Sequence, residues 1–233
     1  MGSYATVFSQ KAFVLIASLP ANDPIIAKEA LNAGADVLKV HINLHHRASG
    51  QQFGSLHEEQ SRLVEILRLA RAKGVPVGIV PGAEPVVNLG LLTELRDMGF
   101  SFISAYAQHL GPEALTLTGI DRMIAPDYTY SIPEVTALGT LGFEVLEASV
   151  IPPDRYGAPL SLRDLARYHA IATAVPMPVV VPTQLRIQPE EVSFLRQAGV
   201  RGVMIGAVVT GRDAAGMARA TQAFRRAIDG SRL

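Results

Sequence analysis

The segment Ala35-Asp-Val-Leu-Lys-Val-His-Ile-Asn43 decides the fold expected for this chain of 233 residues. It follows Gly34 and alternates apolar with polar residues, which is the period of a β-strand with two different faces. A second segment, Phe143-Glu-Val-Leu-Glu-Ala-Ser149, follows Gly142 with the same spacing of Val-Leu and then a charge. Both segments are therefore predicted to be buried parallel strands, and each carries one charged side chain.

Short runs rich in valine and isoleucine alternate with helical patterns along the chain. Near-continuous apolar strands separated by helices indicate a parallel sheet that is covered on its outer face. Because the composition does not change along the chain, we predict one domain over residues 1–233, an α/β protein of the (β/α)8 TIM-barrel class. The predicted strands are 13–18, 36–42, 77–80, 101–105, 122–125, 144–150, 179–181 and 202–205.

Local signals agree with this alternation. Ser55-x-x-Glu58 and Ser161-x-x-Asp164 have the spacing of capping boxes, which begin helices. Glycines at the ends of helical patterns are typical of the residue that follows a helix, where positive φ is favoured. They are Gly34, Gly74, Gly99, Gly142 and Gly199.

The composition limits the possible functions. The formal net charge is zero, so the sequence has no electrostatic signature of nucleic-acid or membrane binding. The chain has no cysteine, which excludes disulfides and thiolate metal sites. Without a signal-peptide pattern or a long apolar run, a cytoplasmic protein is expected. We expect no bound cofactor, a small-molecule partner and, since the helical faces are apolar enough, a possible homo-oligomer.

Lys39 and Glu147 are the strongest candidates for catalysis. Their strands are the second and sixth of eight, so they lie on opposite sides of the barrel, and the alternation turns both side chains inward in the same layer. An unpaired charge there would cost several kcal/mol. Three roles are open: an acid/base pair for proton transfer next to a carbonyl, a Schiff base at Lys39, or an ion pair without catalytic function.

The two longest strand-to-helix connections, 43–54 and 151–160, follow the same two strands and should border the active-site mouth. His41 would lie one layer nearer the mouth than Lys39, and it is grouped with the catalytic candidates. Asn43 and Arg47 are candidate substrate contacts. His41, His45 and His46 could bind a metal, contact substrate or be solvated, and without a ligand spacing such as H-E-x-x-H we assign no metal site.

The C-terminal quarter carries the predicted phosphate site. TIM barrels often bind phosphate between the loops after strands 7 and 8, at the backbone N–H groups of a short extra helix. Gly206 allows the close backbone approach that such a site needs. Tight packing of strand against helix is the alternative explanation. The candidate ligand residues are Thr183, Gln184, Arg186, Gly206, Ala207 and Val208.

On these residues the chain resembles the ribulose-phosphate-binding barrel superfamily, and most of all the N-acetylmannosamine-6-phosphate 2-epimerases, over residues 121–228. Val203-Met-Ile-Gly-Ala-Val-Val-Thr210 is similar to the family's V-V-V-G-S-A-I-T phosphate segment. Gln184-Leu-Arg-Ile187 stands at the family's E-G-R-I, and His46-Arg-Ala-Ser-Gly50 is loosely similar to its R-x-R-P-D-G loop. The resemblance implies a barrel that binds a phosphorylated ligand.

The chain departs from that family at the catalytic positions. The family's lysine in G-I-I-K is replaced by Pro81 of Gly78-Ile-Val-Pro81, and its glutamate in E-G-R-I by Gln184. Lys39 and Glu147 would have to replace the missing pair. We therefore expect an isomerase or epimerase of small phosphorylated sugars or related metabolites. A class I aldolase-type lyase and a non-catalytic phosphate-binding barrel are the alternatives.

Overall fold

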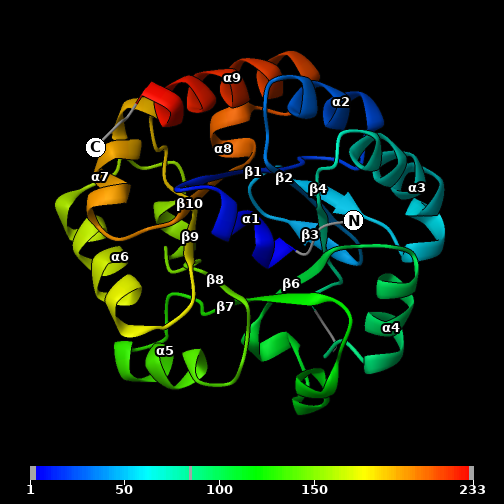
Figure 1. Ribbon diagram of the computed structural model, residues 1–233, viewed down its shortest axis with the longest axis horizontal. Coiled ribbons are helices and arrows are strands. Elements are labelled where there is room, and N and C mark those ends of the chain that lie inside the picture. The colour runs from blue at the N-terminus through cyan, green and yellow to red at the C-terminus, as the bar shows by residue number, and fades with distance from the viewer. Residues whose placement is uncertain (1–3, 84–85, 231–233) are drawn as a thin grey trace.

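The computed structural model describes residues 4–83 and 86–230. Within them, eight parallel strands close a barrel in the order β1-β10-β9-β8-β7-β6-β5-β2, and helices surround it (Figure 1). The predicted TIM barrel is therefore confirmed. The barrel strands are β1 (Val14–Ser18), β2 (Val37–His41), β5 (Val77–Val80), β6 (Phe102–Tyr106), β7 (Asp121–Ala125), β8 (Val145–Glu147), β9 (Val179–Pro182) and β10 (Gly202–Ile205).

The outer helices begin and end where local chemistry predicts. Ser55 and Ser161 form capping boxes with Glu58 and Asp164, and each of the glycines expected after a helix has positive φ. A third capping box at Ser131 was not predicted. The helices are α2 (Pro24–Asn32), α3 (Leu56–Ala72), α4 (Leu89–Asp97), α5 (Ile132–Gly139), α6 (Leu162–Ala174), α7 (Val192–Gln197), the short α8 (Ala207–Thr210) and α9 (Ala214–Gly230).

Two connections differ from the regular alternation. The segment after β2 forms an antiparallel hairpin of β3 (Leu44–His46) and β4 (Gln51–Phe53), where the sequence indicated only a long loop. Between β6 and β7 the chain forms the 3-10 helices η1 (Ala107–His109) and η2 (Pro112–Thr116) in place of an α-helix. Two more 3-10 helices, η3 (Pro153–Arg155) and η4 (Pro189–Glu191), precede α6 and α7.

An N-terminal helix that the sequence did not indicate, α1 (Tyr4–Gln10), lies across the end of the barrel where the strands begin (Figure 1). Its Tyr4 side chain is completely buried and stacks on Phe102, with ring centroids 3.8 Å apart. Gly78 makes room for this pair, because a Cβ there would overlap the Phe102 ring. Arg201 donates to the carbonyls of Phe8, Lys11 and Ala12 at the other end of the helix.

The strands separate an outer and an inner core. Leu38, Val40 and Ile42 pack outward against the helices, as do Leu146 and Ala148, so the predicted alternation is correct. The inner core near α1 is apolar and contains Ile16, Val37, Phe102, Met123, Val145, Val180 and Met204 together with Tyr4 and Phe8. This apolar layer forms the floor beneath the polar residues of the mouth.

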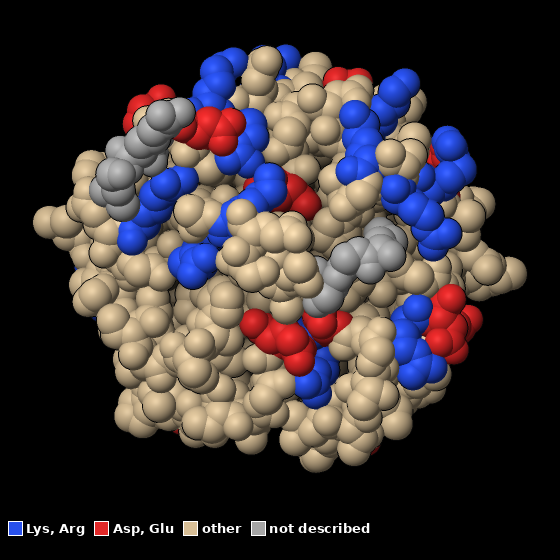
Figure 2. Space-filling model, in the orientation of Figure 1, with Lys and Arg blue, Asp and Glu red and all other residues tan. Residues whose placement is uncertain are grey.

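Among the described residues, basic and acidic side chains mix on the face that carries α1. Figure 2 shows the basic side chains mainly over the upper half and the right side of this face, with acidic ones beside several of them. Asp36, for example, is bonded to both Lys11 and Arg225 at this end of the barrel. Over residues 4–83 and 86–230, none of the helices combines the length and apolar character that crossing a membrane requires.

Candidate functional site

A cavity of about 770 Å³ opens at the end of the barrel opposite α1. Residues at the carboxyl ends of the strands and in the loops that follow them line it, which is where TIM barrels place their active sites. Its lining includes many of the candidates from the sequence, namely Lys39, His41, Asn43, Arg47, Glu147, Thr183, Gln184, Gly206 and Ala207. The structure therefore brings these side chains to one hollow.

Lys39 and Glu147 meet on the floor of this cavity. Lys39 Nζ donates to Glu147 Oε2 over 3.0 Å, and both residues are 6% exposed. Ser104 Oγ donates to the same oxygen at 3.1 Å, and Ser149 Oγ donates to Oε1 at 2.8 Å. The geometric expectation that the two charges face each other across the barrel is confirmed. They are in direct contact, however, and do not stand apart on two sides of a substrate space.

The hydrogen bonds of this pair leave groups available for a ligand. Within the described residues Lys39 Nζ has Glu147 as its one hydrogen-bond acceptor, so two of its three N–H donors remain. The Glu147 carboxylate has roughly four acceptor sites, of which three are used, and the remaining one is on Oε1. One bound group could therefore meet a donor and an acceptor side by side.

His41 and His46 form a neutral wall beside the pair. The His41 ring lies 4.7 Å from the His46 ring and 4.9 Å from that of Phe53, under the β3–β4 hairpin. Burial, together with His46 and Lys39, lowers the pKa of His41 well below its ordinary value. Burial and Lys39 lower the pKa of His46 to about 4. Both imidazoles are therefore uncharged near neutral pH and can donate or accept hydrogen bonds.

The connection after β8 closes another side. Tyr156 accepts a hydrogen bond from Gln184 Nε2 at 2.6 Å, and Gln184 Oε1 accepts from the backbone N–H of Ile151 at 3.2 Å. The guanidinium of Arg47, from the hairpin after β2, lies 5.9 Å from the Tyr156 ring centre. The two connections that the sequence singled out thus meet over the cavity. Burial raises the pKa of Tyr106, which also lines it, so its hydroxyl is protonated at neutral pH.

The predicted phosphate residues fall into two groups. Gly206 and Ala207 line the cavity where β10 leads into α8, and Gly206 N–H donates to Thr183 Oγ1 at 2.9 Å. The free backbone donors expected for an anion would therefore be those that begin α8 rather than Gly206 itself. Val208 and Arg186 are absent from the described cavity wall, and Arg186 is exposed. The chain leaves strand β9 at Pro182, so alternation no longer directs the Arg186 side chain inward.

Asn43 takes the only positive φ found among the described non-glycine residues, at 54°. Asparagine tolerates this conformation better than other side chains. Its side-chain amide donates to the Pro81 carbonyl at 3.0 Å, so Asn43 turns the chain from β2 into the hairpin as well as lining the cavity.

Sequence reasoning missed several residues of the wall. Ser18 is paired with Lys39 in register and lies 3.5 Å from His41 Nε2 through its hydroxyl. Ser104 and Tyr106 come from β6, and their inward direction follows from the same alternation that identified Lys39. Tyr156 and His109 come from irregular connections, where no periodicity gives the direction of a side chain. Asp127 and Tyr128, which follow β7, also line the mouth.

No group of three or more potential metal-binding His, Asp or Glu side chains occurs within residues 4–83 and 86–230. His41 and His46 lie close together, but within the described residues no third side chain of this kind joins them.

Comparison with solved structures identifies the architecture. Tryptophan synthase from Mycobacterium tuberculosis superposes with a TM-score of 0.73 at 14% identity, over 98% of this chain and 99% of that one. The chain has the TIM-barrel fold. This TIM barrel is also similar to thiamine phosphate pyrophosphorylase from Pyrococcus furiosus, with a TM-score of 0.67 at 14% identity over 94% and 96% of the two chains.

A structure described as native KDPGal gives a TM-score of 0.67 at 18% identity, over 95% of this chain and 97% of that one. At these identities the likeness shows the fold alone. No family model matches the sequence, and no curated protein sequence is significantly similar to it. The function of this TIM barrel must therefore be argued from the residues of its cavity.

Proposed function

We propose that this TIM barrel is an acid/base enzyme that removes and returns the proton next to a carbonyl group in a small phosphorylated metabolite. This is the chemistry of sugar-phosphate isomerases and epimerases. The observation that carries the proposal is the contact of 3.0 Å between Lys39 and Glu147 on the floor of the cavity. A buried pair of this kind is weak support for stability, and apolar residues would serve the core as well.

The pair matches the bonds that must change. Glu147 Oε1 would accept the proton from the carbon next to the carbonyl, while the C–H electrons form a carbon–carbon double bond. The carbonyl oxygen becomes negative in that step, and a free N–H donor of Lys39 would stabilise it. Because the acidic hydrogen and the carbonyl oxygen belong to neighbouring carbons, one edge of the substrate can meet both groups. For isomerisation, Glu147 would return the proton to the former carbonyl carbon, while the hydroxyl proton of the deprotonated carbon passes through Lys39 to the former carbonyl oxygen. For epimerisation, water would supply a proton to the opposite face of the same carbon as the carbonyl forms again, and Glu147 would lose its proton to the resulting hydroxide.

The rest of the cavity suits a small polyol. Hydroxyl and amide groups of Ser18, Tyr106, Tyr156, Thr183 and Gln184 line it, together with the neutral rings of His41 and His46. Arg47 has no acidic partner among the described residues and lies at the mouth. With the backbone donors that begin α8, it offers a positive site for a phosphate group.

Proton exchange in D2O tests the proposal directly. The protein would be incubated with a panel of three- to six-carbon aldose and ketose phosphates. Proton NMR would follow the loss of the resonance of the hydrogen on the carbon next to the carbonyl, as deuterium replaces it. We expect exchange with at least one compound and its loss in both Glu147→Gln and Lys39→Met. Exchange that survives both substitutions would contradict the proposal. Tight binding without exchange across the panel would favour a non-catalytic phosphate-binding barrel.

A second candidate, an imine-forming lyase, is favoured by one observation. The chain has four lysines, at positions 11, 28, 39 and 73, and Lys39 alone is buried. Reduction with borohydride in the presence of carbonyl substrates, followed by mass spectrometry of the peptides, separates the two candidates. A substrate adduct on Lys39 supports the lyase. If no adduct forms with a substrate whose carbon-bound proton does exchange, the isomerase is supported.

A further inference from the structure

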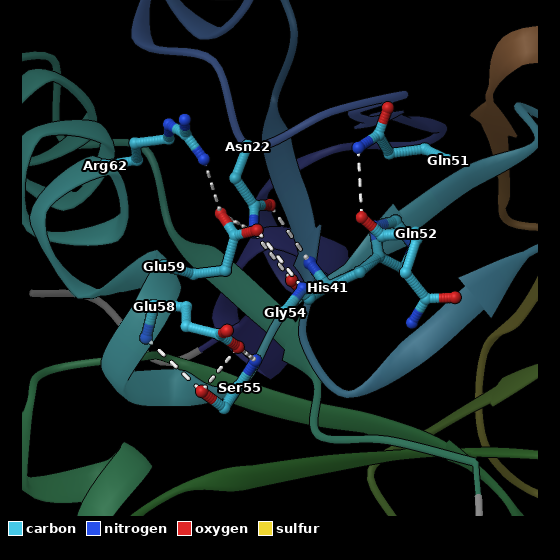
Figure 3. A network of polar contacts seen from close by, with 9 residues as sticks. All are labelled: Asn22, His41, Gln51, Gln52, Gly54, Ser55, Glu58, Glu59 and Arg62. Carbon is cyan, nitrogen blue, oxygen red and sulfur yellow. Dashed lines mark hydrogen bonds and ion pairs between the residues drawn. The ribbon is translucent and has the colours of Figure 1, made fainter.

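A cluster of polar side chains lies behind His41, on the side away from the cavity (Figure 3). Asn22, in the connection after β1, is 4% exposed, and Glu59, in the first turns of α3, is 7% exposed. Neither residue lines the cavity. A buried amide and a buried carboxylate require hydrogen-bond partners, so their contacts indicate what they hold in place.

The Asn22 side chain forms hydrogen bonds with both backbone groups of His41. Its Oδ1 accepts from the His41 N–H at 3.3 Å, and its Nδ2 donates to the His41 carbonyl at 2.7 Å. Both backbone groups of His41 are therefore fixed by a single side chain at the point where β2 ends. The remaining hydrogen of Nδ2 points to Glu59 Oε2 at 3.2 Å.

Glu59 connects Asn22 to the hairpin. Its second oxygen, Oε1, accepts from the backbone N–H of Gly54 at 3.3 Å. Gly54 is the foot of the hairpin, because its carbonyl accepts from Asn43 N–H at 2.8 Å just before β3. Figure 3 shows the Glu59 carboxylate between Asn22 and Gly54, with Arg62 on its outer side. The Arg62 contact is 3.4 Å long and its side chain is 61% exposed, so it contributes little.

The hairpin in turn covers the His41 ring. Phe53 of β4 and His46 of β3 lie against it, and its Nδ1 is buried without a hydrogen-bond partner. Glu59 bonds to the backbone of Gly54 and Asn22 bonds to the backbone of His41, so the two side chains link the foot of the hairpin to the residue whose ring the hairpin covers.

We propose that Asn22 and Glu59 are positioning residues that couple the β3–β4 hairpin to His41. With both bonds of Glu59 intact, the hairpin stays closed and the imidazole keeps its direction toward Ser18 and the cavity. Loss of either bond would release the foot of the hairpin and admit water to the ring. This inference rests on the proposed function only where turnover is concerned, because the coupling itself can be measured without substrate.

Neighbouring glutamates provide a matched experiment. Glu59→Gln removes the charge from the coupling carboxylate, whereas Glu58→Gln makes the same change one residue earlier. Glu58 is exposed and bonds to Ser55 in the capping box, a role that glutamine also fills. Asn22→Asp keeps the acceptor for His41 N–H but loses the donor to its carbonyl, and it faces Glu59 with a second acid.

The readouts are the imidazole signal of His41 in histidine-labelled protein, assigned with His41→Gln, and amide hydrogen exchange. His46 and Lys39 are the charged or titratable groups that face this ring, and they are unchanged in all variants. We expect the His41 signal of the native protein and of Glu58→Gln to stay constant as the pH falls to about 5. In Glu59→Gln and Asn22→Asp it should begin to titrate, and exchange at Gly54 should accelerate about tenfold as a charge-assisted bond is lost.

The double variant Asn22→Asp with Glu59→Gln restores a donor opposite an acceptor, so it should recover part of the protection at Gly54. The proposal is overturned if Glu59→Gln leaves both the His41 titration and the Gly54 exchange as in Glu58→Gln. If the coupling is present but no substrate shows proton exchange, the proposed function fails alone. If the carbon-bound proton of the substrate exchanges at the native rate in Glu59→Gln, the positioning role is contradicted while the proposed function stands.

Discussion

Replacing Lys39 with methionine tests whether the floor of the cavity is a charged pair held in a dry interior. The methionine keeps most of the length of the side chain and removes the ammonium. Glu147, which is 6% exposed, would then keep two serine hydroxyls as hydrogen-bond donors but lose its counter-ion. Breaking a buried pair by removing one partner costs about 3–5 kcal/mol, and the two serines place this case near 3 kcal/mol.

A double-mutant cycle measures the interaction free energy between Lys39 and Glu147. For a chain of this length, about 3 kcal/mol lowers the Tm by roughly 6–12 °C. Adding Glu147→Gln to Lys39→Met should recover about 2 kcal/mol instead of adding a second loss, because no uncompensated charge remains. Urea unfolding of the native protein, the two single variants and the double variant gives the four free energies of unfolding.

The stability of the double variant also separates the two explanations of the pair. A variant near native stability that has lost proton exchange would show that the charges are retained for chemistry. A Lys39→Met protein that unfolds within about 1 °C of the native protein would contradict a buried charge pair at this position. Losses of stability in the two single variants that simply add in the double variant would contradict it as well.

Three further predictions concern other parts of the molecule. Because the pKa of His46 is about 4 in the folded state and 6.5 otherwise, the unfolded state binds more protons between these values, and stability should fall by up to about 3 kcal/mol as the pH drops from 6.5 to 4. His46→Gln should flatten this part of the stability profile and exposed His57→Gln should not. Gly78→Ala should destabilise the barrel by about 3 kcal/mol or more, measured by thermal unfolding, since the added methyl group overlaps an aromatic ring. Arg47→Met should weaken binding of a sugar phosphate about tenfold in calorimetry, as expected for a charge-assisted contact, and Arg163→Met should leave it unchanged.

The alternation of side chains in regular strands explains why much of the site could be predicted. Lys39 and Glu147 lie within β2 and β8. The direction of a side chain there follows from its odd or even position along the strand, and the alignment of the two strands follows from the closed barrel. Their contact could therefore be predicted from one sequence. Ser104 obeys the same rule, but a serine in an apolar strand is a weaker indication of function than a buried charge, because burying a hydroxyl costs much less free energy.

Other parts could not be read from the sequence because they depend on tertiary contacts. The direction of Arg186 is undetermined once the chain leaves β9, and the structure turns it to solvent. The approach of Arg47 to Tyr156 joins two loops more than a hundred residues apart, and no local pattern encodes it. The seven residues of α1 are too few to form a stable helix alone, so only their docking on Phe102, Asp121 and Arg201 explains it.

The docking of α1 has a consequence for how this protein matures on the ribosome. Translation produces α1 before the barrel strands that it contacts, and Arg201, which bonds to its carbonyl end, follows 193 residues after Phe8. Tyr4 has no ring to stack on until Phe102 has been made. The α1 segment therefore has its full set of contacts only after Arg201 has been made, and the end of the barrel that it covers lacks this cover until then.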